Sequence, residues 1–168
     1  MENVQLQTDA AEISAHYNMN GDNVVYLTNS AAGLRAMLTT VKSNATNIRG
    51  IVAYETVGVV FPERAGVEQG TDGFGPVIVP DEDFKKLAEL DEIQLVFGDH
   101  RAEEFSGVQD ARRVAELINE DGGNANVLML GEDEGLKGSS HIAFADMDNE
   151  QVAGLLDDFL ERNGLDEY

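Results

Sequence analysis

The hydrophobic positions of the chain fall into short apolar runs that alternate with segments of helical periodicity. Four of these runs predict buried β-strands, at residues 23–28, 49–54, 93–97 and 125–130. After the first run, apolar side chains recur at the spacing of an amphipathic helix, at Ala31, Leu34, Met37, Leu38 and Val41. Similar stripes predict helices around residues 111–118 and from residue 148 onward, and a weaker stripe predicts a helix over residues 4–17.

Strands that alternate with helices indicate an α/β fold. We expect three layers, with a mostly parallel four-stranded sheet in the order 1-2-3-4 between flanking helices, because short right-handed crossovers place successive strands side by side. The length of 168 residues suits one domain, which we expect to span residues 1–168. Residues 55–80 contain five glycines and predict an irregular, lid-like excursion from that domain.

Three residues whose side chains can act together in catalysis follow three of the predicted strands. Ser30, Glu55 and His141 occur in that order along the chain, and the carboxyl ends of parallel strands meet at one edge of the sheet. A serine hydroxyl becomes an effective nucleophile when a histidine takes its proton and a carboxylate orients that histidine. The spacing therefore predicts a Ser-His-Glu catalytic triad. Asp99 follows the third predicted strand and is the alternative acid.

The segments around these residues resemble a known family. The matching segments are residues 27–33 (LTNSAAG), 51–55 (IVAYE), 60–63 (VFPE) and 137–141 (KGSSH). Together they resemble the C-terminal half of an α/β-hydrolase, from the nucleophile elbow through the last helix. They are most similar to bacterial serine esterases whose acid is a glutamate directly after the sixth strand. The resemblance covers about residues 22–165, which is nearly the whole chain.

The resemblance implies a role for each matching residue. Ser30 would be the nucleophile, His141 the general base and Glu55 the acid that orients it, while the backbone N–H of Ala31 would be one oxyanion donor. The elbow pattern G-x-S-x-G is replaced by Thr-Asn-Ser-Ala-Ala at residues 28–32. The family's first four strands have no counterpart in this chain, and neither has the loop that supplies the second oxyanion N–H. Loss of one such donor costs about 2.7–4 kcal/mol of transition-state stabilisation.

Two classes of function therefore stay open. The first is a serine hydrolase, similar to carboxylesterases, that acts on small esters. The second is a catalytically inert remnant of that fold that serves as a binding or assembly module. A second N–H donor near the oxyanion position would distinguish the first class from the second, and it would come from residues 55–80 or from a partner subunit.

The charge of the chain bears on its surroundings more than on its chemistry. There are 11 Lys and Arg residues against 32 Asp and Glu, for a net charge of −21. Such a surface repels nucleic acid and anionic membranes. It favours a halophilic protein in a high-salt cytoplasm, because the screening length shortens to about 3 Å at 1 M salt. The chain has no cysteine, no nucleotide-binding glycine motif and no calcium loop, so we expect neither a cofactor nor a metal.

The resemblance also leads to an expectation about assembly. Without the neighbouring strands of the complete fold, residues 24–27 form an apolar edge strand and part of one sheet face is bare. An open apolar edge favours pairing with another chain. We expect a homodimer that joins the sheets or buries the open faces together, and the alternative is a heteromeric partner that supplies the missing half.

Overall fold

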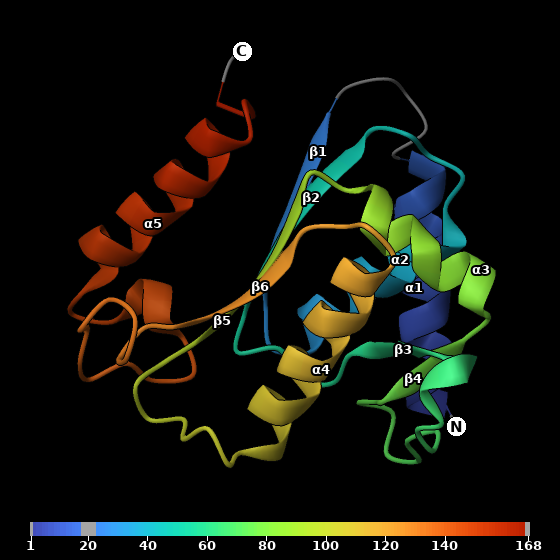
Figure 1. Cartoon of the computed structure of the whole chain (residues 1–168), viewed down its shortest axis with the longest axis horizontal. Helices are drawn as coiled ribbons and strands as arrows, with labels where there is room; N and C mark the ends of the chain where they lie inside the picture. The colour runs from blue at the N-terminus through green and yellow to red at the C-terminus, as the bar shows by residue number, and fades with distance from the viewer. Residues whose placement is uncertain (1, 18–22, 167–168) are drawn as a thin grey trace.

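The computed structural model describes residues 2–17 and 23–166, and its central element is a parallel four-stranded sheet (Figure 1). The strands are β1 (Val24–Asn29), β2 (Ile48–Tyr54), β5 (Glu92–Phe97) and β6 (Ala125–Met129). Every neighbouring pair in this sheet is parallel. The four carboxyl ends therefore lie along one edge, where the loops that follow the strands meet.

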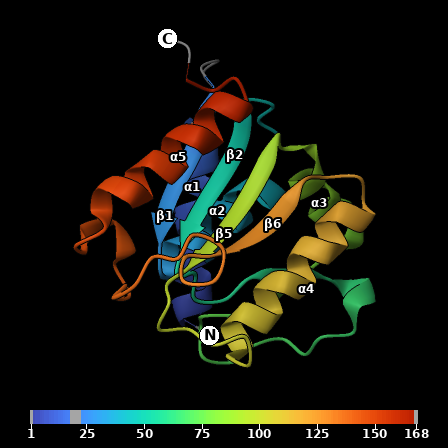
Figure 2. The same ribbon diagram turned by 60° about the vertical axis from the view of Figure 1, so that its left-hand side comes forward.

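Helices cover both faces of the sheet, so the fold has three layers. On one face lies α5, and on the other lie α2 and α4, with α1 packed against α2 (Figures 1 and 2). The bounds are α1 (Glu2–Tyr17), α2 (Ala31–Lys42), α4 (Ser106–Glu120) and α5 (Asn149–Arg162), and a shorter helix, α3 (Asp81–Phe84), continues as a 3-10 helix (Lys85–Glu89). No helix in the part of the chain that the structure describes is long and apolar enough to cross a bilayer.

The core is divided between the two faces of the sheet. In β2, Ile51 and Ala53 face the larger cluster, which includes Leu34 of α2, whereas Val52 and Tyr54 face the smaller cluster with Phe159 of α5. Successive side chains of a strand point to opposite faces. Because both faces of this sheet are covered, the strands appear in the sequence as continuous apolar runs rather than alternating ones.

The predicted strand numbering requires a correction. The sheet has the order β1-β2-β5-β6, because residues 55–80 contain two further strands that were predicted to be irregular chain. These are β3 (Val60–Pro62) and β4 (Val77–Val79), which pair in parallel as a separate two-stranded sheet. Val60 and Phe61 are fully buried in the larger core cluster. This part of the segment is therefore packed into the molecule.

A buried carboxylate fastens the end of α5 to the start of β5. Glu92, whose side chain is 5% exposed, accepts hydrogen bonds from Arg162 at 2.7 and 2.8 Å, from Asn163 at 2.7 Å and from Asn126 at 2.6 Å. Burial raises the pKa of Glu92, but these hydrogen bonds outweigh it, so the pKa lies below its ordinary value of 4.5. Since α5 follows the loop that carries His141, the Glu92 cluster also fixes one end of the element behind the candidate site.

We predict that Arg162→Met destabilises the protein more than Arg49→Met does. Both arginines make two-pronged bonds to a carboxylate and are similarly exposed, at 43% and 42%. Loss of Arg162 leaves Glu92 buried and should cost about 1.5–3 kcal/mol of unfolding free energy. Asp91, the partner of Arg49, is more exposed. The Arg49→Met substitution should therefore lower the unfolding free energy by no more than about 1 kcal/mol. Urea unfolding at neutral pH measures both.

The lowered pKa of Glu92 also predicts how the stability lost in Arg162→Met depends on pH. Because the folded-state pKa of Glu92 is lowered, the contribution of Arg162 is complete above pH 4.5 and is lost as the pH falls through the lowered value. The wild-type protein and Arg162→Met should therefore converge in stability in acid. Equal losses for the two variants at neutral pH would contradict this account of the Glu92 cluster.

Candidate active site

Ser30 occupies a strained turn between β1 and α2. Its φ of 57° and ψ of −131° lie in a region that costs a non-glycine residue about 1–3 kcal/mol. The turn is held from both sides, because Ser30 donates its N–H to Tyr54 O at 3.0 Å and its carbonyl accepts from Gly33 and Val57. Although Ser30 stands at the N-cap of α2, its hydroxyl bonds no N–H of this helix in the described structure. Such a strand-turn-helix junction presents the hydroxyl at the edge of the sheet.

Gly33 allows this turn to pack closely against the end of β2. A Cβ at Gly33 would lie 2.8 Å from the Cβ of Thr56 and 3.2 Å from that of Ala53, and it would also contact the Thr56 hydroxyl. Contacts of this kind exclude any side chain at this position. The glycine that the elbow requires for close helix–strand packing thus stands one position later than in G-x-S-x-G.

Glu55 is a second strained residue, at the end of β2. Its φ is 48°, and it and Ser30 are the two non-glycine residues of positive φ within residues 2–17 and 23–166. The backbone N–H of Glu55 donates to Val96 O at 2.8 Å. Its side chain is 1% exposed; Oε1 accepts from Gly98 N at 2.7 Å and Oε2 accepts from Arg101 Nε at 2.8 Å.

His141, in the loop between β6 and α5, faces this carboxylate. Its Nδ1 lies 3.7 Å from Glu55 Oε2, is buried, and has no hydrogen-bond partner among the described residues. This distance exceeds the hydrogen-bonding range, and catalytic contacts are often long before substrate binds. The ring therefore turns Nδ1 toward the Glu55 carboxylate and leaves Nε2 on its opposite edge.

Asn29 links the elbow to the loop that carries His141. With its amide nitrogen turned toward the two carbonyl groups that it faces, Asn29 donates to His141 O at 3.0 Å and to Tyr54 O at 3.3 Å. That orientation satisfies both polar atoms of the amide. The residue before Ser30 is thus bonded to the residue predicted to be its base, so the elbow and the histidine loop form one connected unit.

Asp99 holds the histidine loop by its backbone. Its carboxylate accepts from Gly138 N at 2.9 Å and from Ser139 N at 2.8 Å. The hydrogen bond from Gly138, together with that from Ser139, holds the pKa of Asp99 below its ordinary value despite partial desolvation. Asp99 was the alternative acid, but it is Glu55 whose carboxylate faces His141 Nδ1.

Ala31 is the first residue of α2. The first N–H groups of a helix have no intrahelical acceptor and carry the positive end of the helix dipole. The Ala31 N–H therefore has the polarity that an oxyanion donor requires. Val57, in the segment proposed to supply the second donor, directs its N–H to the carbonyl of Ser30 at 3.2 Å and is not free for that role.

An arginine and a histidine at this site were not predicted from the sequence. Arg101 bonds Glu55, and His100 Nε2 lies 3.6 Å from Glu55 Oε2. Both follow Gly98 directly after β5, at the same edge of the sheet as the other strand ends. Their position after a predicted strand was the signal that could have identified them.

An apolar groove of about 250 Å³ opens beside the elbow, between the end of β1 and α5. Its walls include Leu27, Asn29, Tyr54, Phe144 and Leu156. Leu27 and Phe144 are 57% and 47% exposed, so the groove continues into apolar surface at the free edge of the sheet.

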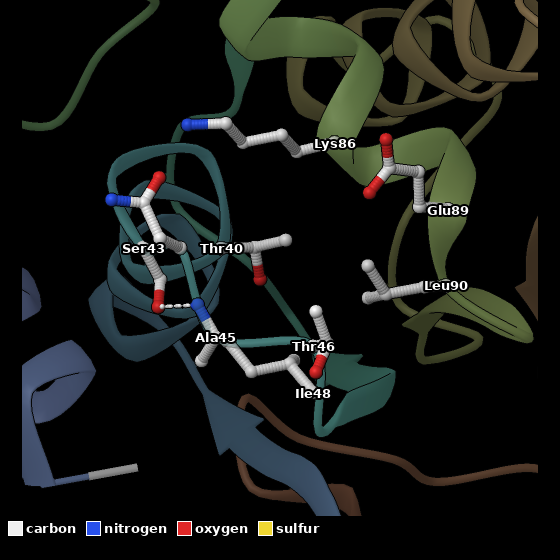
Figure 3. Close-up of a pocket in the computed structure, with 9 residues that line it drawn as sticks. Thr40, Ser43, Ala45, Thr46, Ile48, Lys86, Glu89 and Leu90 are labelled. Carbon is white, nitrogen blue, oxygen red and sulfur yellow. Dashed lines mark hydrogen bonds between the residues drawn. The ribbon is translucent and has the colours of Figure 1, made fainter. Parts of the chain in front are cut away.

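Another hollow, of about 280 Å³, lies at the amino end of β2. Figure 3 shows Thr40 and Ser43 on one side of it and Lys86 and Glu89 on the other. The ammonium group of Lys86 already donates to Val41 O at 2.8 Å and to Asp83 at 3.0 Å. Since ligands of parallel sheets bind at the carboxyl ends of strands, we assign no site here.

Metal ligation is not a feature of the residues that the structure describes. Among them, no group of three or more His, Asp or Glu side chains is placed to hold a metal ion. His100 and His141 both lie within 4 Å of Glu55 Oε2, and this oxygen accepts a hydrogen bond from Arg101.

Comparison with known proteins gives one relevant likeness. No protein-family model matches the chain, and no curated protein matches it significantly. A bacterial esterase whose structure is known at atomic resolution is similar, with a TM-score of 0.69 and 25% sequence identity. The likeness covers 91% of this chain and 42% of the esterase, so the chain spans less than half the length of that protein. The fold described above is therefore esterase-like.

We predict that Asp99→Ala loosens the loop that carries His141. Loss of the acceptor frees the amides of Gly138 and Ser139, whose hydrogen exchange should accelerate about tenfold or more. Asp133→Ala is the matched control, because Asp133 bonds the Met129 amide at the other end of the same loop. In that variant the exchange of Gly138 and Ser139 should not change.

The same contacts should fail in acid. Because the pKa of Asp99 is lowered in the folded protein, its contacts are complete above the ordinary value of 3.8 and are lost as the pH falls through the lowered value. Exchange in the wild-type protein should then approach that of Asp99→Ala, after correction for the intrinsic rates. An unchanged exchange rate in Asp99→Ala at neutral pH would show that other bonds hold the loop.

Proposed function

We propose that the chain is a serine hydrolase of small esters that acts through Ser30, His141 and Glu55. One observation carries the proposal: the two non-glycine residues of positive φ in the described chain are the predicted nucleophile and the predicted acid. Strained residues of this kind cluster at active sites. The likeness to a bacterial esterase over 91% of the chain supports the same reaction class.

In the proposed acylation step, Ser30 Oγ attacks the carbonyl carbon of the ester while its proton passes to His141 Nε2. Glu55 stabilises the imidazolium through Nδ1, which lies 3.7 Å from its carboxylate before substrate binds. The Ala31 N–H donates to the oxyanion of the tetrahedral intermediate. The ester C–O bond then breaks as His141 returns the proton to the leaving alcohol, and an acyl-serine remains.

Deacylation repeats these steps with water. A water molecule gives a proton to His141 as its oxygen attacks the acyl carbon, and collapse of the intermediate returns the proton to Ser30 and releases the carboxylic acid. The groove beside Asn29 is apolar and would accept an acyl chain. With one oxyanion donor the rate would be about 10²–10³-fold below that of a site with two.

We predict that a fluorophosphonate probe forms one covalent adduct with the protein in molar KCl. Intact mass should increase by a single adduct, and Ser30→Ala should give none. Ser106→Ala is the matched control, because Ser106 also begins a helix after a loop and should leave the adduct unchanged. His141→Gln should slow labelling about 10²–10⁴-fold, because the general base is lost.

Absence of the adduct on folded wild-type protein would overturn the hydrolase proposal. An adduct that persists in Ser30→Ala would place the reactive group elsewhere. Absence of any adduct would favour the second candidate, a binding or assembly module.

The free edge of the sheet favours this second role. β1 is an outer strand of the four-stranded sheet, and Leu27 is exposed there next to the apolar groove. A second copy related by a two-fold axis would pair β1 with its equivalent and cover both grooves. The charge of −21 opposes self-association at low ionic strength, so concentrated salt should favour such a homodimer.

We predict a dimeric mass by light scattering in molar KCl. Leu27→Lys should convert the protein to a monomer, because a lysine on an edge strand opposes pairing. Ile13→Lys is the matched control, since Ile13 is 59% exposed against 57% for Leu27 and belongs to the helix α1, which packs against α2, and not to the sheet. A monomeric wild-type mass in molar KCl would contradict the homodimer.

A further inference from the structure

Three cationic or ionisable groups converge on one oxygen of the buried Glu55 carboxylate. Arg101 Nε donates to Oε2 at 2.8 Å, whereas His100 Nε2 and His141 Nδ1 stand 3.6 and 3.7 Å from the same atom. The other oxygen, Oε1, accepts the N–H of Gly98 at 2.7 Å. Of the three side chains that face Oε2, only Arg101 is within hydrogen-bonding distance.

We infer that Arg101 is a positioning residue that holds the Glu55 carboxylate away from His141 and thereby limits how strongly this acid stabilises the imidazolium. The inference rests on the proposed function, in which His141 is the base. A charge-assisted hydrogen bond at 2.8 Å is stronger than an electrostatic contact at 3.7 Å, so the carboxylate orients toward the guanidinium. The buried, unpartnered Nδ1 of His141 is the direct consequence.

Arg101 is itself held in place. Its guanidinium lies over the ring of Phe105 at 4.3 Å from the centroid, which is a favourable cation–π geometry. A guanidinium also keeps its charge throughout the pH range in which imidazoles titrate. Arg101 therefore offsets a constant part of the negative charge of Glu55 across that pH range.

Two other ionisable side chains near Glu55, those of His100 and Asp99, have different effects on the site. His100, from the same loop as Arg101, adds a second positive charge when it is protonated. Asp99 directs its carboxylate to the N–H groups of Gly138 and Ser139, so it orients the histidine loop and does not compete for Nδ1. Arg101 is thus the one permanently charged side chain bonded to Glu55 in the described structure.

A merely structural arginine would have a different signature. Removal of the partner of a buried carboxylate destabilises a protein whether or not that carboxylate takes part in catalysis. A structural role would lower the labelling rate equally at every pH. A positioning role would change the pH dependence of the rate, because it changes the stability of protonated His141.

The experiment measures fluorophosphonate labelling rates from about pH 6 to about pH 8, the range in which imidazoles titrate. In Arg101→Gln, the ratio of the rate at the upper pH to that at the lower pH should rise about three- to tenfold, because protonated His141 becomes more stable. Arg112→Gln removes the same charge from an ion pair with the exposed Glu103 and should leave the ratio unchanged. Arg101→Lys should restore part of the wild-type ratio.

Phe105→Leu provides a second variant that keeps every charge. It removes the ring beneath the guanidinium and should raise the ratio in the same direction by a smaller factor. If Arg101→Gln fails to fold, the ratio of labelling rates measured in Phe105→Leu tests the inference instead. A ratio equal to that of the wild-type protein in the folded variants would overturn the inference.

Imidazole nitrogen spectra separate this inference from the proposed function. The ring signals of His141 are assigned by their loss in His141→Gln and titrated without any probe. In Arg101→Gln their midpoint should move to higher pH, and in Arg112→Gln it should not. If the wild-type protein does not react with the probe but the midpoint moves, the positioning role holds and the hydrolase proposal fails. If the midpoint does not move, Arg101 is only a structural counter-ion.

Discussion

The candidate site depends on the hydrogen-bond ladder of the parallel sheet, which continues one residue beyond the strands. Ser30 donates its N–H to Tyr54 O, and Glu55 donates to Val96 O, at 3.0 and 2.8 Å, while Leu130 donates to Phe97 O at 2.8 Å. These bonds set the starting point of each loop relative to its neighbour, so strands distant in sequence deliver their side chains to one place. They also explain how positive φ angles persist at Ser30 and Glu55, because the surrounding bonds over-determine each backbone.

Several carboxylates of this protein are buried or bind the backbone of a loop, in addition to those that lie on its surface. Glu55 and Glu92 are buried and bonded, and Asp99 holds the backbone of the histidine loop. Asp146 holds the same loop through Ser140, whose N–H and hydroxyl it accepts at 2.6 and 3.0 Å. Part of the acidic composition is therefore structural, and it operates where a carboxylate meets N–H groups or a guanidinium. Such contacts depend on carboxylates that stay ionised, which links the geometry of the site to pH.

The sequence predicted the four main strands because both faces of the sheet are covered, which makes the strands continuous apolar runs. It predicted that Ser30, Glu55 and His141 would gather at the carboxyl edge of the parallel strands, and the structure places His141 Nδ1 3.7 Å from Glu55 Oε2. It did not predict β3 and β4, because three residues are too few to establish a period. Neither could it predict that Arg101 would bond Glu55, 46 positions away. That contact depends on side-chain directions in two loops, which no periodicity encodes.

The strain at the site favours a reactive role over a purely structural one. Two positive φ angles at non-glycine residues oppose folding by about 1–3 kcal/mol each. A buried carboxylate with a histidine nitrogen left unpartnered beside it adds a further unfavourable term. An assembly module needs only the edge of β1 and the apolar surface around Leu27. The strained residues and the unpartnered histidine nitrogen contribute neither to that edge nor to that surface. Glycine at Ser30 and Glu55 would fold with less strain, because it has no Cβ. We propose that the strained conformations of Ser30 and Glu55 and the unpartnered nitrogen of His141 serve chemistry on the serine hydroxyl.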